Sequence, residues 1–295
     1  MINERDKGGG SISYYRLLGL EAEPFSTSPD PAFLYQARDH KAALYRLLIS
    51  LRLKRGLSLI LGDVGTGKTT LSRRLYQIAS LEPSYDFHII LNPVFNSETE
   101  FLLKLAELFH MELPKSGLST GQYLDEIEKN LFRRSVEGGK TIVILIDEAQ
   151  KLDRSSLEIL RTLLNYETNE HKLLQLILMS QLELLPKIVD IKNLWDRISL
   201  KYMLNPLSLS EMKEMINFRL LHAGYQARKP LFPDDVLELI YGYTQGYPRK
   251  TTALCHDILE RLVMENHEAA NREVVQKMIA EEGVILRAAA GACPP

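Results

Sequence analysis

Several features that would place this chain in a special class are scarce or absent. Among its 295 residues are only two cysteines, Cys255 and Cys293, which are too few for a disulfide framework and indicate a reduced, intracellular protein. No apolar run has the length of a membrane span, and the first ten residues lack the apolar core of a signal peptide. We therefore expect a cytoplasmic chain without a direct membrane span.

Net charge is also low. The formal net charge is -2, so bulk electrostatics argue neither for nor against nucleic acid as a partner. The chain is 45% hydrophobic and 25% charged, which is ordinary for a globular protein, and its length predicts one large or two moderate domains. Residues 1–12 are expected to form a flexible leader and residues 284–295 a frayed tail.

One glycine-rich stretch carries the strongest chemical signal. Residues 57–61 are an apolar run suited to a buried strand, "GDVGTGKT" (62–69) fits G-x-x-x-x-G-K-[ST], and Leu71, Leu75 and Ile78 continue at helical spacing. Glycines let backbone N–H groups turn toward phosphate, and the following helix N-terminus adds its dipole. A chance glycine turn is the alternative, which the flanking strand and helix disfavour.

This stretch predicts an ATP site that uses magnesium. Lys68 is expected to reach the terminal phosphates and the Thr69 hydroxyl to ligate Mg²⁺. The candidate nucleotide-binding residues are Gly62, Asp63, Val64, Gly65, Thr66, Gly67, Lys68, Thr69, Thr70 and Asp147.

A second motif follows a run of β-branched and aliphatic residues, Thr141 to Ile146, which indicates a strand buried on both faces. It ends in Asp147 and Glu148, at the edge of the sheet where open α/β sheets bind ligands. We expect Asp147 to hold magnesium and Glu148 to polarise a water toward the γ-phosphate. A metabolite kinase would also need the loop and the Asp, but Glu148 favours water as the acceptor.

The remaining pattern alternates between strands and helices, which predicts a three-layer α/β fold with a mostly parallel sheet. Strands are expected at 87–91, 172–180 and 200–208, and helices at 97–111, 121–137 and 155–169. From residue 210 the strand signal stops, and helices near 210–223, 233–243, 248–266 and 271–282 predict a small α-helical domain. The expected domains are a linker segment (13–56), a nucleotide-binding domain (57–208) and a helical lid (209–283).

The helix predicted to begin at Pro248 has two cations in its first turn, Arg249 and Lys250. A helix N-terminus has partial positive charge and disfavours cations. The two side chains are either solvated or placed to meet an anion such as a nucleotide phosphate.

Taken together, the motifs resemble those of AAA+ ATPases. The P-loop, the Asp-Glu strand end, the polar pair Ser180-Gln181, "LWDRISLKYMLNPLSLSEM" (194–212) and "GYPRK" (246–250) occur in the order typical of that family. "YYRLLGLEAEPFSTSPDPAFLY" (14–35), "LGDVGTGKTTLSRRL" and "LIDEAQKL" are similar to the ExeA/GspA group, which is related to the TniB/TnsC transposition ATPases.

The resemblance implies roles for four further residues. Arg249 would be the second sensor, which reaches the γ-phosphate from the lid, whereas Lys250 would be solvated. Arg197 would be an arginine finger donated to a neighbouring subunit, or else a member of an internal salt bridge. Gln181 or Ser180 would be the first sensor, which orients water. Tyr35 lines the adenine pocket or packs in the interior. The resemblance also implies a homo-oligomer, with a hexameric ring as the candidate assembly.

Two biological roles remain open. The first is assembly or remodelling of a secretion or pilus machine of the cell envelope, and the second is ATP-dependent DNA binding of the TniB/TnsC type. The loop "LNPVFNSETEFLLK" has no Lys or Arg between His88 and Lys104, although phosphate contacts dominate DNA affinity. Phe95 offers an apolar tip suited to polypeptide, so we favour the envelope machine and expect weak DNA binding.

Overall fold

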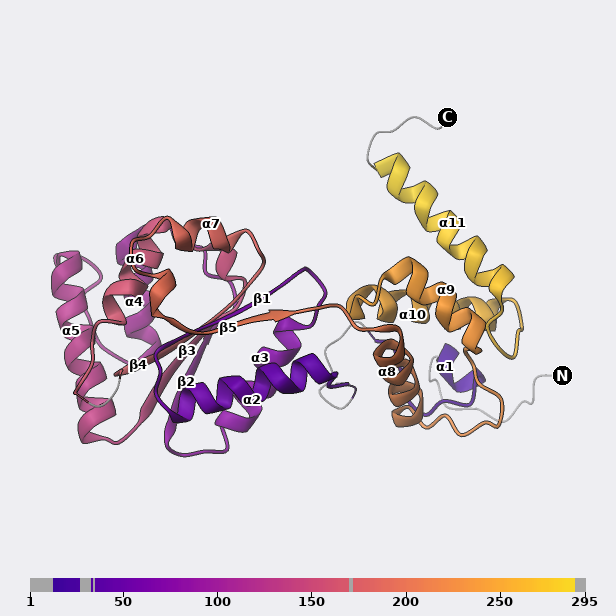
Figure 1. Ribbon diagram of the computed structural model, residues 1–295, viewed down its shortest axis with the longest axis horizontal. Helices are drawn as coiled ribbons and strands as arrows, with labels where there is room; N and C mark the ends of the chain where they lie inside the picture. Colours follow the sequence, from indigo (N-terminus) through magenta and orange to yellow (C-terminus); the bar gives the residue numbers. More distant parts are fainter. Residues whose placement is uncertain (1–12, 27–32, 34, 170–171, 290–295) are drawn as a thin grey trace, which may run out of the picture. The chain divides into compact units, whose positions relative to one another are not determined.

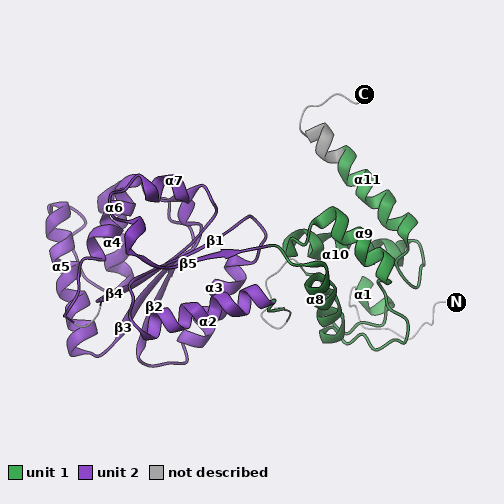
Figure 2. Ribbon diagram, in the orientation of Figure 1, with its two compact units in different colours: residues 1–37, 206–295 green, residues 38–205 purple. Residues whose placement is uncertain are grey.

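The computed structural model describes residues 13–26, 33, 35–169 and 172–289. The chain divides into two compact units, residues 38–205 and residues 1–37 with 206–295 (Figure 2). The expected leader (1–12) and the last residues of the expected tail (290–295) lie outside the described residues.

The unit of residues 38–205 is built around a five-stranded sheet in the order β2-β3-β4-β1-β5, and every pair is parallel (Figure 1). The predicted α/β class is confirmed. The strands are β1 (Leu57–Gly62), β2 (Tyr85–Ile90), β3 (Thr141–Ile146), β4 (Leu174–Ser180) and β5 (Ile198–Leu204).

Burial along each strand follows its place in the sheet. All residues of the central strands β1, β3 and β4 are buried, as expected for strands covered on both faces. The edge strand β5 instead alternates between more and less exposed side chains. Since the strands are parallel, their carboxyl ends meet at one edge, and the polar side chains that follow β1, β3 and β4 gather there.

Helices cover both faces of this sheet (Figure 1). On one face α2 (Arg38–Arg52) and α3 (Lys68–Ala79) pack against Ile60, Val143 and Ile177. The other face is covered by α4 (Glu98–Leu108), α5 (Thr120–Phe132), α6 (Arg154–Leu163) and α7 (Leu184–Val189). A π-helical turn, Arg133–Glu137, continues α5.

The second unit is helical. It contains α1 (Tyr14–Leu17), α8 (Leu209–His222), α9 (Asp234–Thr244), α10 (Pro248–Met264) and α11 (Arg272–Ala289). The N-terminal segment is part of its core: the rings of Phe25 and Phe232 meet edge to face, and the Glu21 N–H donates to the Ala223 carbonyl at 2.7 Å. The expected linker segment is thus divided, because residues 13–37 belong to this unit and α2 to the other.

Several expected boundaries differ from the observed ones. The helix expected at 155–169 ends at Leu163, and the strand expected at 200–208 ends at Leu204, before Asn205-Pro206. Helix α11 continues to Ala289, into the expected tail. Ser97 and Glu100 have the spacing of a capping box, but only half of it forms: Ser97 accepts from the Glu100 N–H, whereas the Glu100 carboxylate accepts from Asn96.

In the part of the chain that the structure describes, no helix combines the length and the apolar character needed to cross a membrane.

Candidate functional site

The glycine-rich loop joins β1 to α3 at the carboxyl edge of the sheet. Gly65 and Gly67 have φ angles of 83° and 97°, which L side chains rarely adopt, so glycine is required at both turns. Gly62 is required for space, because a Cβ there would lie 2.7 Å from the Thr66 hydroxyl. The loop therefore has the curled backbone that the motif predicts.

Lys68 begins α3 and its side chain is buried beneath this loop. Its ammonium donates to the carbonyl oxygens of Gly62 and Asp63, at 2.6 and 2.8 Å. Burial lowers the pKa of Lys68, and the nearby carboxylates of Glu148 and Asp147 partly oppose that shift. A buried cation surrounded by loop backbone is suited to hold an anionic phosphate.

His40 of α2 supports the loop from below, which the sequence did not predict. Its Nε2 lies 2.8 Å from the Thr66 carbonyl oxygen, and since a carbonyl can only accept, Nε2 carries the proton. His40 is buried, and a Cβ on Gly67 would lie 2.5 Å from Nε2. His40 lies in a helix and belongs to no recognised motif, so the sequence carried no specific signal for this contact.

Asp147 follows β3 and faces the start of α3. Its side chain is 2% exposed and hydrogen-bonds with Thr69 and with the Glu148 N–H, the latter at 2.9 Å. Burial raises its pKa, although both hydrogen bonds act in the opposite direction. Two adjacent hard oxygen ligands, the Thr69 hydroxyl and the buried Asp147 carboxylate, are a donor set that fits Mg²⁺.

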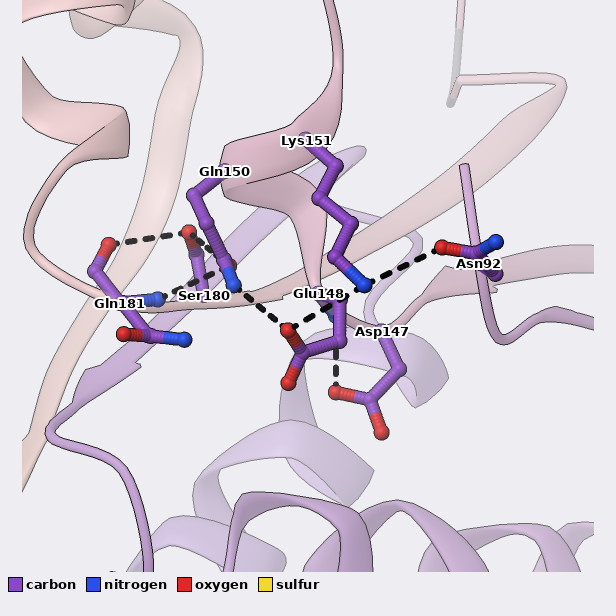
Figure 3. A network of polar contacts seen from close by, with 7 residues as sticks. All are labelled: Asn92, Asp147, Glu148, Gln150, Lys151, Ser180 and Gln181. Atoms are coloured by element: carbon purple, nitrogen blue, oxygen red, sulfur yellow. Dashed lines mark hydrogen bonds and ion pairs between the residues drawn. The ribbon is translucent and has the colours of Figure 1, made fainter. Parts of the chain in front are cut away.

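Glu148 has an unusual backbone and a supported side chain (Figure 3). Its φ of 54° lies in the left-handed region, which is uncommon for residues other than glycine and concentrates at functional sites. Gln150 donates to its carboxylate at 2.7 Å, and Lys151 lies 3.8 Å from the same oxygen and donates to Asn92 at 3.2 Å.

The end of β4 reaches this network. Ser180 is fully buried, and its hydroxyl has two acceptors within reach, the Gln150 side-chain oxygen at 3.1 Å and the Gln181 carbonyl oxygen at 2.9 Å. The Gln181 N–H donates to the same oxygen at 3.2 Å. Figure 3 shows both residues beside Gln150, so the two candidates for the first sensor are brought near Glu148, and the choice between them stays open.

Arg197 lies apart from these residues within its unit. It directly precedes β5, where Ile198 pairs with Leu57 at the amino end of β1, whereas the glycine-rich loop follows the carboxyl end of β1. Arg197 forms no ion pair with another described residue. The expected alternative, an internal salt bridge, is therefore not seen among these residues.

Arg249 and Lys250 are exposed in the first turn of α10, which begins at Pro248 as predicted. A Cβ on Gly246 would overlap the Leu207 carbonyl oxygen, at 1.9 Å, so this approach to α10 requires glycine. The Lys250 ammonium lies 5.5 Å from the Tyr247 ring centre. Arg249 belongs to the helical unit, and its role as a sensor stays a prediction.

Two aromatic residues are half-buried and pack against the cores of their units. The Tyr35 hydroxyl donates to Glu214 at 2.6 Å in the helical unit. Phe95 was wrongly expected to be an apolar tip: its ring packs against Phe101, with 4.8 Å between ring centres. The exposed apolar residues of this loop are Leu91 and Val94.

Comparisons with known proteins agree with the geometry. The AAA domain family matches residues 51–188. General secretion pathway protein A of Aeromonas hydrophila is 36% identical over 245 residues, which are 82% of this chain but only 43% of that protein. The chain thus spans less than half the length of this relative.

Solved structures with the same fold include two archaeal proteins and one from an insect. The ORC2 protein of Aeropyrum pernix in ADPNP-ADP complexes has a TM-score of 0.62 at 17% identity, covering 88% of this chain and 71% of that one. Cdc6p from Pyrobaculum aerophilum scores 0.66 at 16% (88% and 70%), and Drosophila ORC bound to DNA scores 0.65 at 19% (96% and 70%). At these identities the likeness shows the fold alone.

The contact of His40 with the loop predicts a role in nucleotide binding. His40→Ala removes the donor to the Thr66 carbonyl and should weaken nucleotide affinity about tenfold, whereas His40→Gln, which keeps a donor at that reach, should retain most of it. Binding of a fluorescent nucleotide analogue measures the effect, with the exposed His267→Ala as control. Equal affinity in the wild type and His40→Ala would exclude this support of the loop.

The buried carboxylate of Asp147 predicts a pH-dependent gain of stability. In the presence of a chelator that removes Mg²⁺, Asp147→Asn should raise the Tm by about 2–4 °C at neutral pH. The reason is that the wild-type carboxyl group must carry a charge while it is buried, which costs stability. Since the folded-state pKa is raised, the wild type loses stability as the pH rises through that pKa, so the gain should vanish in acid.

Calorimetry at about pH 3 and about pH 7, below and above the ordinary pKa of an Asp carboxyl group, tests this. Asp190→Asn, which changes an exposed carboxylate, is the control and should give no rise. A lower Tm for Asp147→Asn at both pH values would contradict the prediction.

Proposed function

We propose that this chain, which has the P-loop fold of AAA+ ATPases and is related to general secretion pathway protein A, binds and hydrolyses ATP at subunit interfaces. The observation that carries the proposal is the convergence of Lys68, Asp147 and Glu148 at one edge of the sheet. Both carboxylates act electrostatically on the buried ammonium, so the three side chains form one charged group at the glycine-rich loop.

In this proposal the loop binds the nucleotide phosphates. Backbone N–H groups of the loop and the start of α3 point toward the anion, and Lys68 exchanges its carbonyl contacts for phosphate oxygens. The residues assigned to binding are Gly62, Asp63, Val64, Gly65, Thr66, Gly67, Lys68, Thr69, Thr70 and Asp147. Thr69 and Asp147 would hold Mg²⁺, which supplies charge stabilisation for the phosphates when bound.

Glu148 is assigned as the general base. A carboxylate can orient a water and accept its proton, and the contacts with Gln150 and Lys151 hold the Glu148 side chain in place. Gln181 or Ser180 would orient the water from the end of β4. Arg249, in the first turn of α10, would report the bound γ-phosphate from the helical unit.

The position of Arg197 supports hydrolysis between subunits. The next residue, Ile198, pairs with Leu57 at the amino end of β1. β1 has six residues, and at about 3.3 Å per residue its amino end lies roughly 17–20 Å from the loop at its carboxyl end. An arginine side chain cannot cover this distance, so Arg197 cannot complete the site of its own chain. A homo-oligomer, with a ring of six as the candidate, would bring it to a neighbour's site.

The biological role proposed is assembly or remodelling of a secretion or pilus machine of the cell envelope. The similarity to general secretion pathway protein A supports it, as does the cation-free loop after β2, whose exposed Leu91 and Val94 suit a polypeptide better than DNA. We place the protein in the cytoplasm, where ATP is available, with recruitment to the inner membrane by partners.

A mixing experiment tests the shared site. Glu148→Gln and Arg197→Ala should each bind ATP and lose most hydrolysis. Mixed in equal amounts they should recover up to about a quarter of wild-type activity, because that fraction of head-to-tail interfaces combines an intact Glu148 with an intact Arg197. Phosphate release measures the recovery, and Arg154→Ala, which changes an exposed arginine, is the control.

Specific activity of the wild type should also rise faster than linearly with protein concentration. If the mixture stays as inactive as its components while the oligomer forms, Arg197 does not act on a neighbouring site.

The alternative is an ATP-dependent DNA-binding regulator, and one observation favours it. Helix α2 has four Lys or Arg residues and α3 has two besides the buried Lys68, against the single acidic residue Asp39, and both helices cover the same face of the sheet. Such a face can contact phosphates, although without the alignment of a built site its affinity should be weak and steeply salt-dependent.

Electron microscopy with duplex DNA at physiological salt separates the two roles. We expect no regular assembly on DNA with a non-hydrolysable ATP analogue. Regular ATP-dependent filaments or rings on the duplex would instead establish the DNA-binding role. Assemblies that form without DNA would support an oligomeric motor.

A further inference from the structure

Gln150 lies between the proposed base and the end of β4, and it is outside every motif role assigned so far. Its side-chain NH₂ group donates to Glu148, while its side-chain oxygen accepts from the Gln181 N–H and lies 3.1 Å from the Ser180 hydroxyl, which shares its proton between this oxygen and the Gln181 carbonyl (Figure 3). One amide therefore connects residues that follow two neighbouring strands, β3 and β4.

The orientation of this amide is fixed by its partners. The Gln181 N–H can only donate and an ionised Glu148 can only accept, so a flipped amide would lose both contacts. The backbone is held as well: Lys187 of α7 donates to the carbonyls of Gln150 and Leu152, at 2.7 and 2.9 Å. Gln150 thus has one defined position between its two neighbours.

Glu148 depends on such a support because its backbone is in the left-handed region. Lys151 provides a second contact, but at 3.8 Å and with a partly exposed ammonium it is the weaker one. The Gln150 amide is the only neutral hydrogen-bond donor to that carboxylate that the described residues provide.

We infer that Gln150 is a positioning residue that couples the Glu148 carboxylate to Ser180 and Gln181. The inference rests on the proposed hydrolysis of ATP. A phosphate oxygen that accepts from Ser180 or the Gln181 N–H competes with the oxygen of the Gln150 amide for these donors. The amide then turns, and the Glu148 carboxylate turns with it. The orientation of the base thereby depends on what the end of β4 contacts.

The first test separates positioning from binding. Gln150→Glu keeps the acceptor for Ser180 and Gln181 but replaces the donor to Glu148 by a like charge. We expect kcat to fall about 10- to 100-fold while nucleotide Kd stays within about twofold, because a misplaced base affects the chemical step alone. Gln150→Ala should lose kcat in the same way, and Gln77→Ala, the same change on the surface of α3, should not.

The second test addresses the coupling. If Ser180 acts on Glu148 through Gln150, the double variant Ser180→Ala/Gln150→Ala should lose less kcat than the product of the two single fold-losses. A fold-loss in the double variant equal to that product would overturn the coupling. Wild-type kcat in Gln150→Glu, or a loss that appears only in Kd, would overturn the positioning role.

These failures are distinct from failure of the proposed function. The Gln150 inference fails alone if Glu148→Gln is inactive while Gln150→Glu turns over at the wild-type rate. The proposed hydrolysis fails if Glu148→Gln itself retains wild-type turnover. Circular dichroism and Tm establish folding, and the nearly isosteric Gln150→Glu decides the outcome if Gln150→Ala does not fold.

Discussion

The buried ammonium of Lys68, held by two carbonyl oxygens of its own loop, is the interaction on which the candidate site depends. A loop whose N–H groups turn toward phosphate leaves its carbonyls turned the other way, and a cation beneath them stabilises that curl. His40 fixes a third carbonyl from α2, and Gly67 gives it the space to approach. The loop is thus shaped before any ligand arrives, which reduces the ordering that binding requires.

The parallel sheet gathers the remaining chemistry at the same edge. Asp147 and Glu148 follow the central strand β3, Ser180 is the last residue of β4, and the connecting amide of Gln150 lies between them. The same geometry separates Arg197 from this edge, because it precedes its strand instead of following it. One topological rule therefore decides which residues can act within a chain and which must act on another.

Much of this arrangement could be predicted from the sequence. Apolar runs ending in Gly62, Asp147 and Ser180 identified the central strands, and their parallel order then implied a shared edge. Contacts that depend on side-chain direction could not be predicted: His40 belongs to a helix distant in sequence from the loop, and Phe95 is apolar whether it faces Phe101 or solvent. Residues 155–169 had helical character, but Asn165 and Tyr166 instead lead toward the bridge that joins Glu167 and Lys172.

The strand order also determines when the protein can fold as it is synthesised. β1 pairs only with β4 and β5, so the strand that leads into the loop has no sheet partner until about residue 180 has left the ribosome, and its second edge stays open until β5 follows. The core of the helical unit can form only later still, because Phe25 packs against Phe232, which is synthesised more than 200 residues after it. A nascent chain therefore leaves the apolar β1 without its full set of sheet partners from about residue 62 until about residue 204, the period in which such strands are most open to mispairing and to chaperones.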